Sequence, residues 1–192
     1  KAKNYDFTRL ISAIDYPVIV MNDARAEAYA GHWFNGKPED EKIYIMLGEG
    51  VGGAYINASA IRNGVHNRGG EFGHMVIHPG GKQCLCGKKG CFEAYVSEKV
   101  LSSELDMTLD NFFELAAQGN KNNSNVLDEY MDNLALGINN IYTMMDCDIV
   151  LGGTVAPYLK QYDDSIKERL VNDYSFDTDA DYLRISDGGG RK

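Results

Sequence analysis

Three cysteines near the middle of the chain have the spacing of a metal site. Cys84, Cys86 and Cys91 stand as C-x-C-x4-C in "CLCGKKGC", separated mostly by glycine and lysine. That composition predicts a loop, in which three thiolates can converge on one cation. Three cysteines cannot all pair with one another, and the fourth, Cys147, lies far along the chain. Three thiolates and one imidazole would form the closed tetrahedral ligand set of a structural zinc ion.

Two histidines are candidates for the fourth ligand. His74 and His78 both precede the cysteines, in the stretch "HMVIH". If this stretch forms a strand, its period of two places both side chains on one face. Geometry alone therefore leaves the choice between them open.

Carboxylates at three further positions suit chemistry on hydroxyl groups. Asp23 follows an apolar run in "VIVMNDA". A carboxylate there can act as a general base toward a hydroxyl, and it can equally cap the following helix. Glu71 and Glu93 flank the cysteine loop, and each can accept hydrogen bonds from two hydroxyls. The alternative for both glutamates is a solvated surface charge.

Four stretches, in order along the chain, resemble the signature of the ROK family, which joins sugar-responsive repressors, open reading frames of unknown role and sugar kinases. They are "VIVMNDARAEAYAGHW", "LGEGVGGAYI", "GGEFGH" with the C-x-C-G-x-x-G-C-x-E that follows it, and "ALGINNIYTMMDCDIVLGGTV". The resemblance implies an α/β protein with an actin-like (ribonuclease-H-like) sugar kinase fold. Residues 1–192 would be its C-terminal, sugar-binding lobe with a zinc-binding loop. The chain would then be a fragment from which the first lobe and any DNA-binding domain are absent.

The resemblance also implies roles for individual residues. Zinc would be held by His74, Cys84, Cys86 and Cys91, which leaves His78 as an ordinary loop histidine. The sugar would be held by Asn22, Asp23, Glu71, His74 and Glu93, with Asp23 as the catalytic base of a kinase. The phosphate-binding glycines would be Gly48, Gly50, Gly52, Gly53, Gly152 and Gly153, although hairpin glycines also suit a plain turn. Zinc would have the structural task of making Glu71, His74 and Glu93 converge.

The phosphate stretch departs from the kinase pattern. Kinases of the family commonly have Gly-Thr-Gly-x-Gly-Gly, whereas "GEGVGG" has Glu49 in place of the threonine. A carboxylate there repels phosphate unless magnesium intervenes. We therefore expect the effector lobe of a sugar-responsive transcriptional repressor. The alternative, favoured by the retained Asp23, is an ATP-dependent hexose or N-acetylhexosamine kinase, and ATP and magnesium are expected only in that case.

The hydrophobic pattern indicates the elements that position these residues. Strands are predicted at 16–22, 42–48, 53–59 and 147–153, with the middle two joined as a hairpin. Helices are predicted after Asp23 and over 94–105, 108–120, 126–145 and 156–171, with Thr108 as an N-cap and Pro157 in a first turn. The stretch 120–125, "NKNNSN", is predicted to be a polar connection. Ligands are expected where strand ends meet turns.

Composition sets limits on partners. The chain has 192 residues, 19 Lys and Arg, 28 Asp and Glu and a net charge of -9. That balance argues against nucleic-acid contact by this segment, because phosphate contacts need clustered basic residues. No secretory signal or long apolar stretch is visible, so we expect a cytoplasmic protein without a membrane contact. The resemblance adds an expectation of a homo-oligomer.

Overall fold

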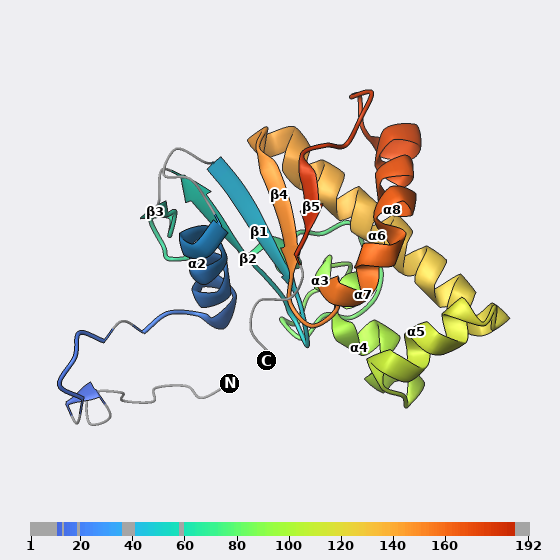
Figure 1. Cartoon of the computed structure of the whole chain (residues 1–192), viewed down its shortest axis with the longest axis horizontal. Helices are drawn as coiled ribbons and strands as arrows, with labels where there is room; N and C mark the ends of the chain where they lie inside the picture. Colours follow the sequence, from blue (N-terminus) through green and yellow to red (C-terminus); the bar gives the residue numbers. More distant parts are fainter. Residues whose placement is uncertain (1–10, 13, 19, 36–40, 58–59, 187–192) are drawn as a thin grey trace.

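The chain folds around a mixed sheet with helices on both faces (Figure 1). The computed structural model describes residues 11–12, 14–18, 20–35, 41–57 and 60–186. Within these residues the sheet has the order β3-β2-β1-β4-β5. Its strands are β1 (Glu41–Leu47), β2 (Val51–Asn57), β3 (Ala60–Ile61), β4 (Asp148–Gly152) and β5 (Leu183–Ile185). β1 and β2 form the predicted antiparallel hairpin, whereas β4 runs parallel to both β1 and β5.

The central strand β1 is buried on both faces. Ile43, Ile45 and Leu47 point to one side and Tyr44 and Met46 to the other, and all five are buried. Burial on both faces is typical of the central strands of α/β proteins, whose sheets are covered by helices on each side. The alternation of side chains along β1 therefore divides the hydrophobic core into two parts.

One face of the sheet is covered by α2 (Asp23–Asn35). Ala24 and Ala28 of this helix pack against a small apolar group on the sheet that includes Tyr44 and Met46. Contact is close at Gly52 of β2, because a Cβ added there would lie 2.6 Å from the Cβ of Ala24. The small side chains thus hold the first turn of α2, with Asp23 at its start, directly over the hairpin.

The other face carries the larger core and most of the helices. These are α3 (Glu93–Val96), α4 (Glu98–Leu101), α5 (Leu109–Ala117), α6 (Lys121–Met145), α7 (Ala156–Leu159) and α8 (Asp163–Arg169), with short turns η1 (Phe72–His74), η2 (Ser103–Leu105), η3 (Lys160–Tyr162) and η4 (Leu170–Tyr174). The buried apolar side chains of α6 face this core, and Tyr130 donates a buried 2.8 Å hydrogen bond to the carbonyl oxygen of Val96. None of the helices in the described residues combines the length and the apolar character needed to cross a bilayer.

The strand predicted at 16–22 is wrong for the residues of that stretch that the structure describes. Residues 16–18 and 20–22 have no strand hydrogen bonding, and the side chains of Tyr16, Val18, Val20 and Met21 are exposed. β-branched residues favour strands because they pack on a pleated, half-buried surface. No such surface covers this stretch in the described part of the chain.

Several predicted boundaries also needed correction. The polar stretch 120–125 is not a connection, because α6 begins at Lys121 and Asn120 caps it by accepting from the N–H groups of Asn122 and Asn123. The helices predicted over 94–105 and 156–171 are divided into short segments, the first interrupted at Ser97. The stretch "HMVIH" forms no strand, and only Val76 makes an isolated bridge, to Cys91. Thr108 caps α5 as predicted.

Candidate functional site

The three loop cysteines and His74 form one compact cluster. Their possible ligand atoms all lie within 4.8 Å of one another. The Sγ atoms of Cys86 and Cys91 are 3.7 Å apart, and Cys84 Sγ lies 3.9 Å from Nδ1 of His74. Zinc bonds of about 2.3 Å to sulfur and 2.0 Å to nitrogen imply tetrahedral edges of roughly 3.6 to 3.8 Å. The donor set and its spacing therefore fit a zinc ion.

The loop that carries the cysteines is shaped by its own backbone. The N–H of Cys84 donates to the carbonyl oxygen of Lys88, and the N–H of Gly87 donates back to that of Cys84. Gly87 and Gly90 have φ values of 89° and 81°, which glycine adopts without strain. A Cβ at Gly90 would also lie 1.7 Å from the carbonyl oxygen of His78. The glycines between the cysteines thus turn the thiols inward.

The thiols of the cluster differ in acidity. Burial raises the pKa of Cys84 to about 12 and also raises the pKa of Cys91. The pKa of Cys86 is lowered, first by the backbone N–H of Lys88 and then by the thiol of Cys84. Two of the three ligands are therefore protonated at neutral pH until a cation compensates their charge.

The cluster is anchored in the core by the residue after its last cysteine. The side chain of Phe92 is fully buried, and its N–H donates 2.8 Å to the carbonyl oxygen of Met75. Its ring lies against α6 at Gly137, where an added Cβ would come within 2.2 Å of the ring. Only glycine leaves room for this contact. The position of Cys91 is therefore tied to the middle of the longest helix.

His78 lies outside the cluster, as the family resemblance implied. Its Nε2 is 2.5 Å from Oδ1 of Asn133, and its ring makes an edge contact with Tyr95 at 4.7 Å between centroids. Its side chain is engaged in packing the loop against α6. Cys147 likewise lies elsewhere, partly buried at the start of β4.

A cleft of about 590 Å³ runs beside the cluster. Volumes of roughly 300 to 1,000 Å³ are usual for small-molecule sites. The lining includes all five residues predicted to bind sugar, which are Asn22, Asp23, Glu71, His74 and Glu93. They come from the start of α2, from η1 and from the start of α3, so the fold gathers residues that are up to 71 positions apart.

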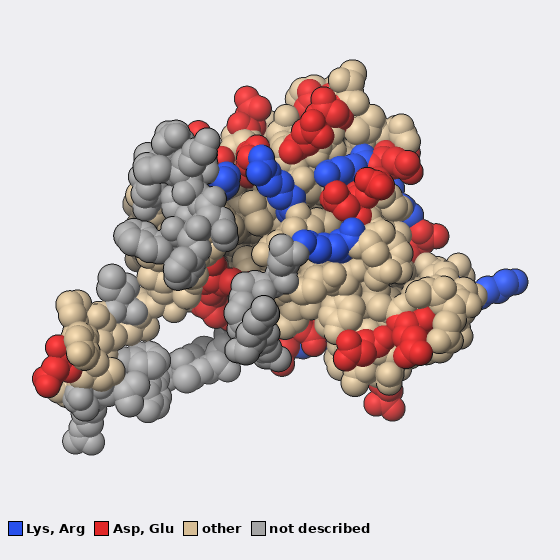
Figure 2. All heavy atoms as spheres, viewed as in Figure 1, with Lys and Arg blue, Asp and Glu red and all other residues tan. Residues whose placement is uncertain are grey.

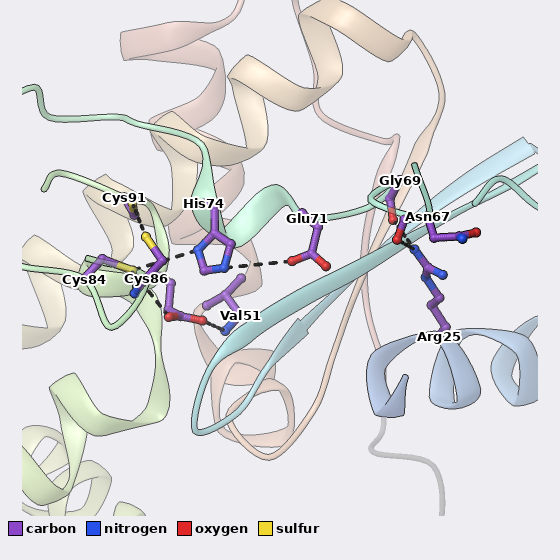
Figure 3. Close-up of polar contacts among 10 residues, drawn as sticks. Arg25, Val51, Asn67, Gly69, Glu71, His74, Cys84, Cys86 and Cys91 are labelled. Atoms are coloured by element: carbon purple, nitrogen blue, oxygen red, sulfur yellow. Dashed lines mark hydrogen bonds and ion pairs between the residues drawn. The ribbon is translucent and has the colours of Figure 1, made fainter. Parts of the chain in front are cut away.

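His74 connects the metal cluster with this cleft. Its Nδ1 is directed toward Cys84, whereas its Nε2 points toward Glu71, 3.9 Å from the carboxylate (Figure 3). The two ring nitrogens thus face different partners, one among the thiols and one in the cleft. A carboxylate beyond the second nitrogen of a ligating histidine is a common way to fix its ring orientation.

Asn22 and Asp23 both lie at the start of α2, and their hydrogen bonds show which of them caps the helix. Oδ1 of Asn22 accepts from the N–H of Arg25 at 3.4 Å, which is the contact of an N-cap residue. Oδ1 of Asp23 accepts from the adjacent N–H of Ala24 at 2.8 Å. Asn22 is therefore the cap, and Asp23, which also lines the cleft, contacts only the N–H next to it in the first turn.

The predicted phosphate-binding glycines divide into two groups. Gly48, Gly50, Gly52 and Gly153 line the cleft together with Glu49. Gly53 and Gly152 do not. Gly53 is needed instead for close packing, because an added Cβ would lie 2.5 Å from Phe72 and 3.0 Å from the carbonyl oxygens of Tyr44 and Gly70. Gly152 packs against the end of the Met46 side chain.

Sequence reasoning did not identify several polar residues around the cleft. Arg25 donates to the carbonyl oxygens of Asn67 and Gly69 and so fixes the loop that leads to Glu71 (Figure 3). Glu27, Lys99 and Thr154 line the cleft near the glycines. These contacts join residues far apart in the chain, and no spacing in a single sequence reveals them.

The charged side chains visible on one face are of both signs (Figure 2). In that view several Lys and Arg side chains of the described residues lie beside Asp and Glu. Among the ion pairs of the molecule, Arg169 lies 2.6 and 2.7 Å from Asp128 and Asp132. This face therefore has no continuous basic surface within the described residues.

The sequence profile described as the ROK family matches residues 1–185. This chain belongs to the ROK family. It is 32% identical over 141 residues to the xylose repressor of Bacillus subtilis strain 168, covering 70% of this chain and 37% of the repressor. It is 29% identical over 157 residues to the N-acetylmannosamine kinase of Yersinia pestis strain Pestoides F, covering 79% of this chain and 53% of the kinase. The chain thus spans about half or less of the length of these ROK relatives.

Solved ROK structures share the fold. The ROK hexokinase from Thermus thermophilus superposes with a TM-score of 0.71 and 27% identity, covering 85% of this chain and 58% of that one. The chain therefore has the actin-like fold of ROK proteins. Repressors and sugar kinases both occur among the relatives.

Proposed function

We propose that this chain is the sugar-binding effector lobe of a ROK-family transcriptional repressor. The observation that carries the proposal is the cleft in which Asn22, Asp23, Glu71, His74 and Glu93 converge beside a Cys3His cluster. Carboxylates, an amide and an imidazole provide donors and acceptors in the mixture that sugar hydroxyls require. The relatives named as a xylose repressor and an N-acetylmannosamine kinase support a sugar as the ligand class.

The cluster would hold one structural zinc ion through His74, Cys84, Cys86 and Cys91. Three thiolates and one imidazole complete a tetrahedral set and leave no open position for a reacting group. The ion would fix the loop and the ring of His74. Nε2 of His74 and the carboxylates of Glu71 and Glu93 would then be preorganised for hydroxyl groups of the sugar.

Glu49 supports the repressor over the kinase. It lines the glycine-rich end of the cleft, and a carboxylate there raises the cost of bringing in a triphosphate. The DNA-binding residues of such a repressor would lie outside this segment, whose net charge is -9. This lobe would then transmit the presence of the sugar to them.

The second candidate is an ATP-dependent sugar kinase, and Asp23 favours it. Asp23 lines the same cleft, where its carboxylate could accept a proton from a sugar hydroxyl. ATP and magnesium would then bind at the glycine-rich end, and phosphoryl transfer would need donors from both lobes.

A thermal-shift panel on the full-length protein tests the proposal. One sugar among pentoses, hexoses and N-acetylhexosamines should raise the melting temperature in proportion to the logarithm of its concentration, because it binds only the folded state. The same sugar should release the protein from operator DNA. Phosphorylation of that sugar with ATP, abolished by Asp23→Asn, would refute the repressor and establish the kinase. Stabilisation by no sugar would refute both.

A further inference from the structure

Two donor groups in the turn after β4, at the glycine-rich end of the cleft, are occupied by carboxylates of the chain itself. The N–H of Gly153, in the turn after β4, donates to Oε1 of Glu27 at 3.2 Å. The hydroxyl of the next residue, Thr154, donates to Oε2 of Glu98. These contacts span 126 and 56 positions of the sequence, so they are made by the fold and not by local chain geometry.

A third donor, on the hairpin, has a similar partner. The N–H of Val51, directly after the glycine-rich turn, donates to Oε2 of Glu93 at 3.0 Å. A Cβ at Gly50 would lie 2.8 Å from the same oxygen, so glycine is needed to admit the carboxylate. The hairpin and the turn after β4 therefore each direct a backbone N–H at a carboxylate.

Phosphate sites in proteins depend on the same kind of donor. Backbone N–H groups in glycine-rich turns bind phosphate oxygens because they can approach closely and carry partial positive charge. Here the oxygens of Glu27, Glu93 and Glu98 take the hydrogen bonds that phosphate oxygens would take. These three donors are thus occupied from within the molecule.

The charge of the cleft reinforces this arrangement. Its lining has one ammonium group, from Lys99, and five carboxylates, from Asp23, Glu27, Glu49, Glu71 and Glu93. Glu27 is exposed and can rotate away from Gly153 at little cost, but its charge would stay near the turn. Charges closer together than the Debye length of about 8 Å still repel at physiological salt. The negative charge of Glu27 would therefore oppose a phosphate more than the loss of its hydrogen bond to Gly153 would.

We propose that Glu27 is a built-in substitute for a nucleotide phosphate, which occupies the Gly153 turn and, with Glu49, makes the sugar site independent of nucleotide. The inference rests on the proposed function for the sugar half of the cleft. It adds a specificity-determining residue, Glu27, which the glycine pattern of the hairpin does not report.

Isothermal titration of the full-length protein with ATP and magnesium tests the role of Glu27. The variants are Glu27→Gln, which keeps an acceptor for Gly153 and removes the charge, Glu27→Ala, and the double variant Glu27→Gln/Glu49→Thr. Glu168→Gln, on the exposed side of α8, is the matched control for the loss of one negative charge. We expect each Glu27 variant to lower the dissociation constant for ATP by about tenfold, the double variant by more, and the control to match the wild type.

Two results would overturn the inference. One is a wild-type dissociation constant for ATP below about 100 μM, and the other is a Glu27→Gln variant that binds ATP within about twofold of the wild type or not at all, whatever the double variant does. Sugar-dependent stabilisation of the wild type is measured in parallel and tests only the proposed function. A gain of ATP binding in a protein that no sugar stabilises would therefore support the role of Glu27 and refute the sugar site.

Discussion

Zinc binding to the cluster is expected to release between two and three protons per chain at neutral pH. The perturbation is the addition of zinc to full-length protein stripped by a chelator. Burial raises the pKa of Cys84 to about 12 and also raises that of Cys91, so each holds a full proton in the metal-free chain. The pKa of Cys86 is lowered, so this thiol contributes less than one. All three must be deprotonated to bind the ion.

The proton count fixes the pH dependence of zinc affinity. Each proton that competes with the metal changes the apparent dissociation constant by about tenfold per pH unit, so two to three protons imply about 100- to 1,000-fold. The protonated thiols are the competing form. Affinity is therefore high above the pKa values of the thiols and is lost progressively as the pH falls, which makes binding at pH 6.5 weaker than at pH 7.5 by this factor.

Calorimetry in buffers of different ionisation enthalpy measures the protons released, and competition with a chromophoric chelator measures the affinity. Cys147→Ser is the control, because this thiol is partly buried outside the cluster and should leave both quantities unchanged. Release of one proton or fewer would refute the three-thiolate site. Loss of zinc in the Cys147→Ser variant would refute the assignment of the ligands.

Three further predictions concern hydrogen bonds seen in the structure. Arg25→Gln removes the donors to the carbonyl oxygens of Asn67 and Gly69, so amides 63–70 should exchange with deuterium about tenfold faster than in the wild type. Arg184→Gln, in an exposed ion pair, should leave these exchange rates unchanged. Wild-type exchange rates in the Arg25→Gln variant would refute the role of Arg25. Glu93→Gln should weaken sugar binding by about tenfold with the zinc content unchanged, and unaltered sugar affinity would remove Glu93 from the site. Tyr130→Phe leaves a buried carbonyl oxygen without its partner, and should lower the free energy of unfolding by about 1 to 2 kcal/mol in urea titrations. Tyr16→Phe changes an exposed ring and should leave the free energy of unfolding unchanged. An equal loss of stability in both variants would contradict the role of the Tyr130 hydrogen bond.

The pattern of apolar residues in the sequence was sufficient to predict β1 and α6, the central elements of the fold. β1 contains a short continuous run of apolar residues, and α6 repeats apolar residues at helical spacing, so each could be predicted from local pattern alone. The stretch at 16–22 has the same apolar character but no neighbouring strand among the described residues. Strand propensity is realised only on a partner, and the sequence does not contain that information.

The prediction for residues 120–125 was wrong for a different reason, which is helix capping. "NKNNSN" was predicted to be a connection because asparagine favours turns, yet Asn120 uses its side chain to begin a helix and the following residues form the first turn. The same chemistry serves both structures, and the apolar stripe that follows decides between them. β5 was not predicted because its three residues are too few to show a period.

The grouping of the cleft residues could be predicted only through the resemblance to ROK proteins, and their roles remain predictions. The contacts of Arg25 and Glu27 were not predicted. Both side chains lie on α2, where a charged residue usually faces water, and their partners are 44 and 126 positions away. Such pairs follow from the packing of α2 on the hairpin at Gly52.

If the cluster holds zinc, the contact between Phe92 and Gly137 would link the supply of metal to the lifetime of the protein. Loss of zinc would free Cys91, and with it the ring that lies beside the middle of α6. We expect the helix to open locally more often in the metal-free chain, and open segments are what proteases cleave. The metal-free chain would then be degraded faster than the zinc-bound chain. The amount of protein in a cell would follow the availability of zinc.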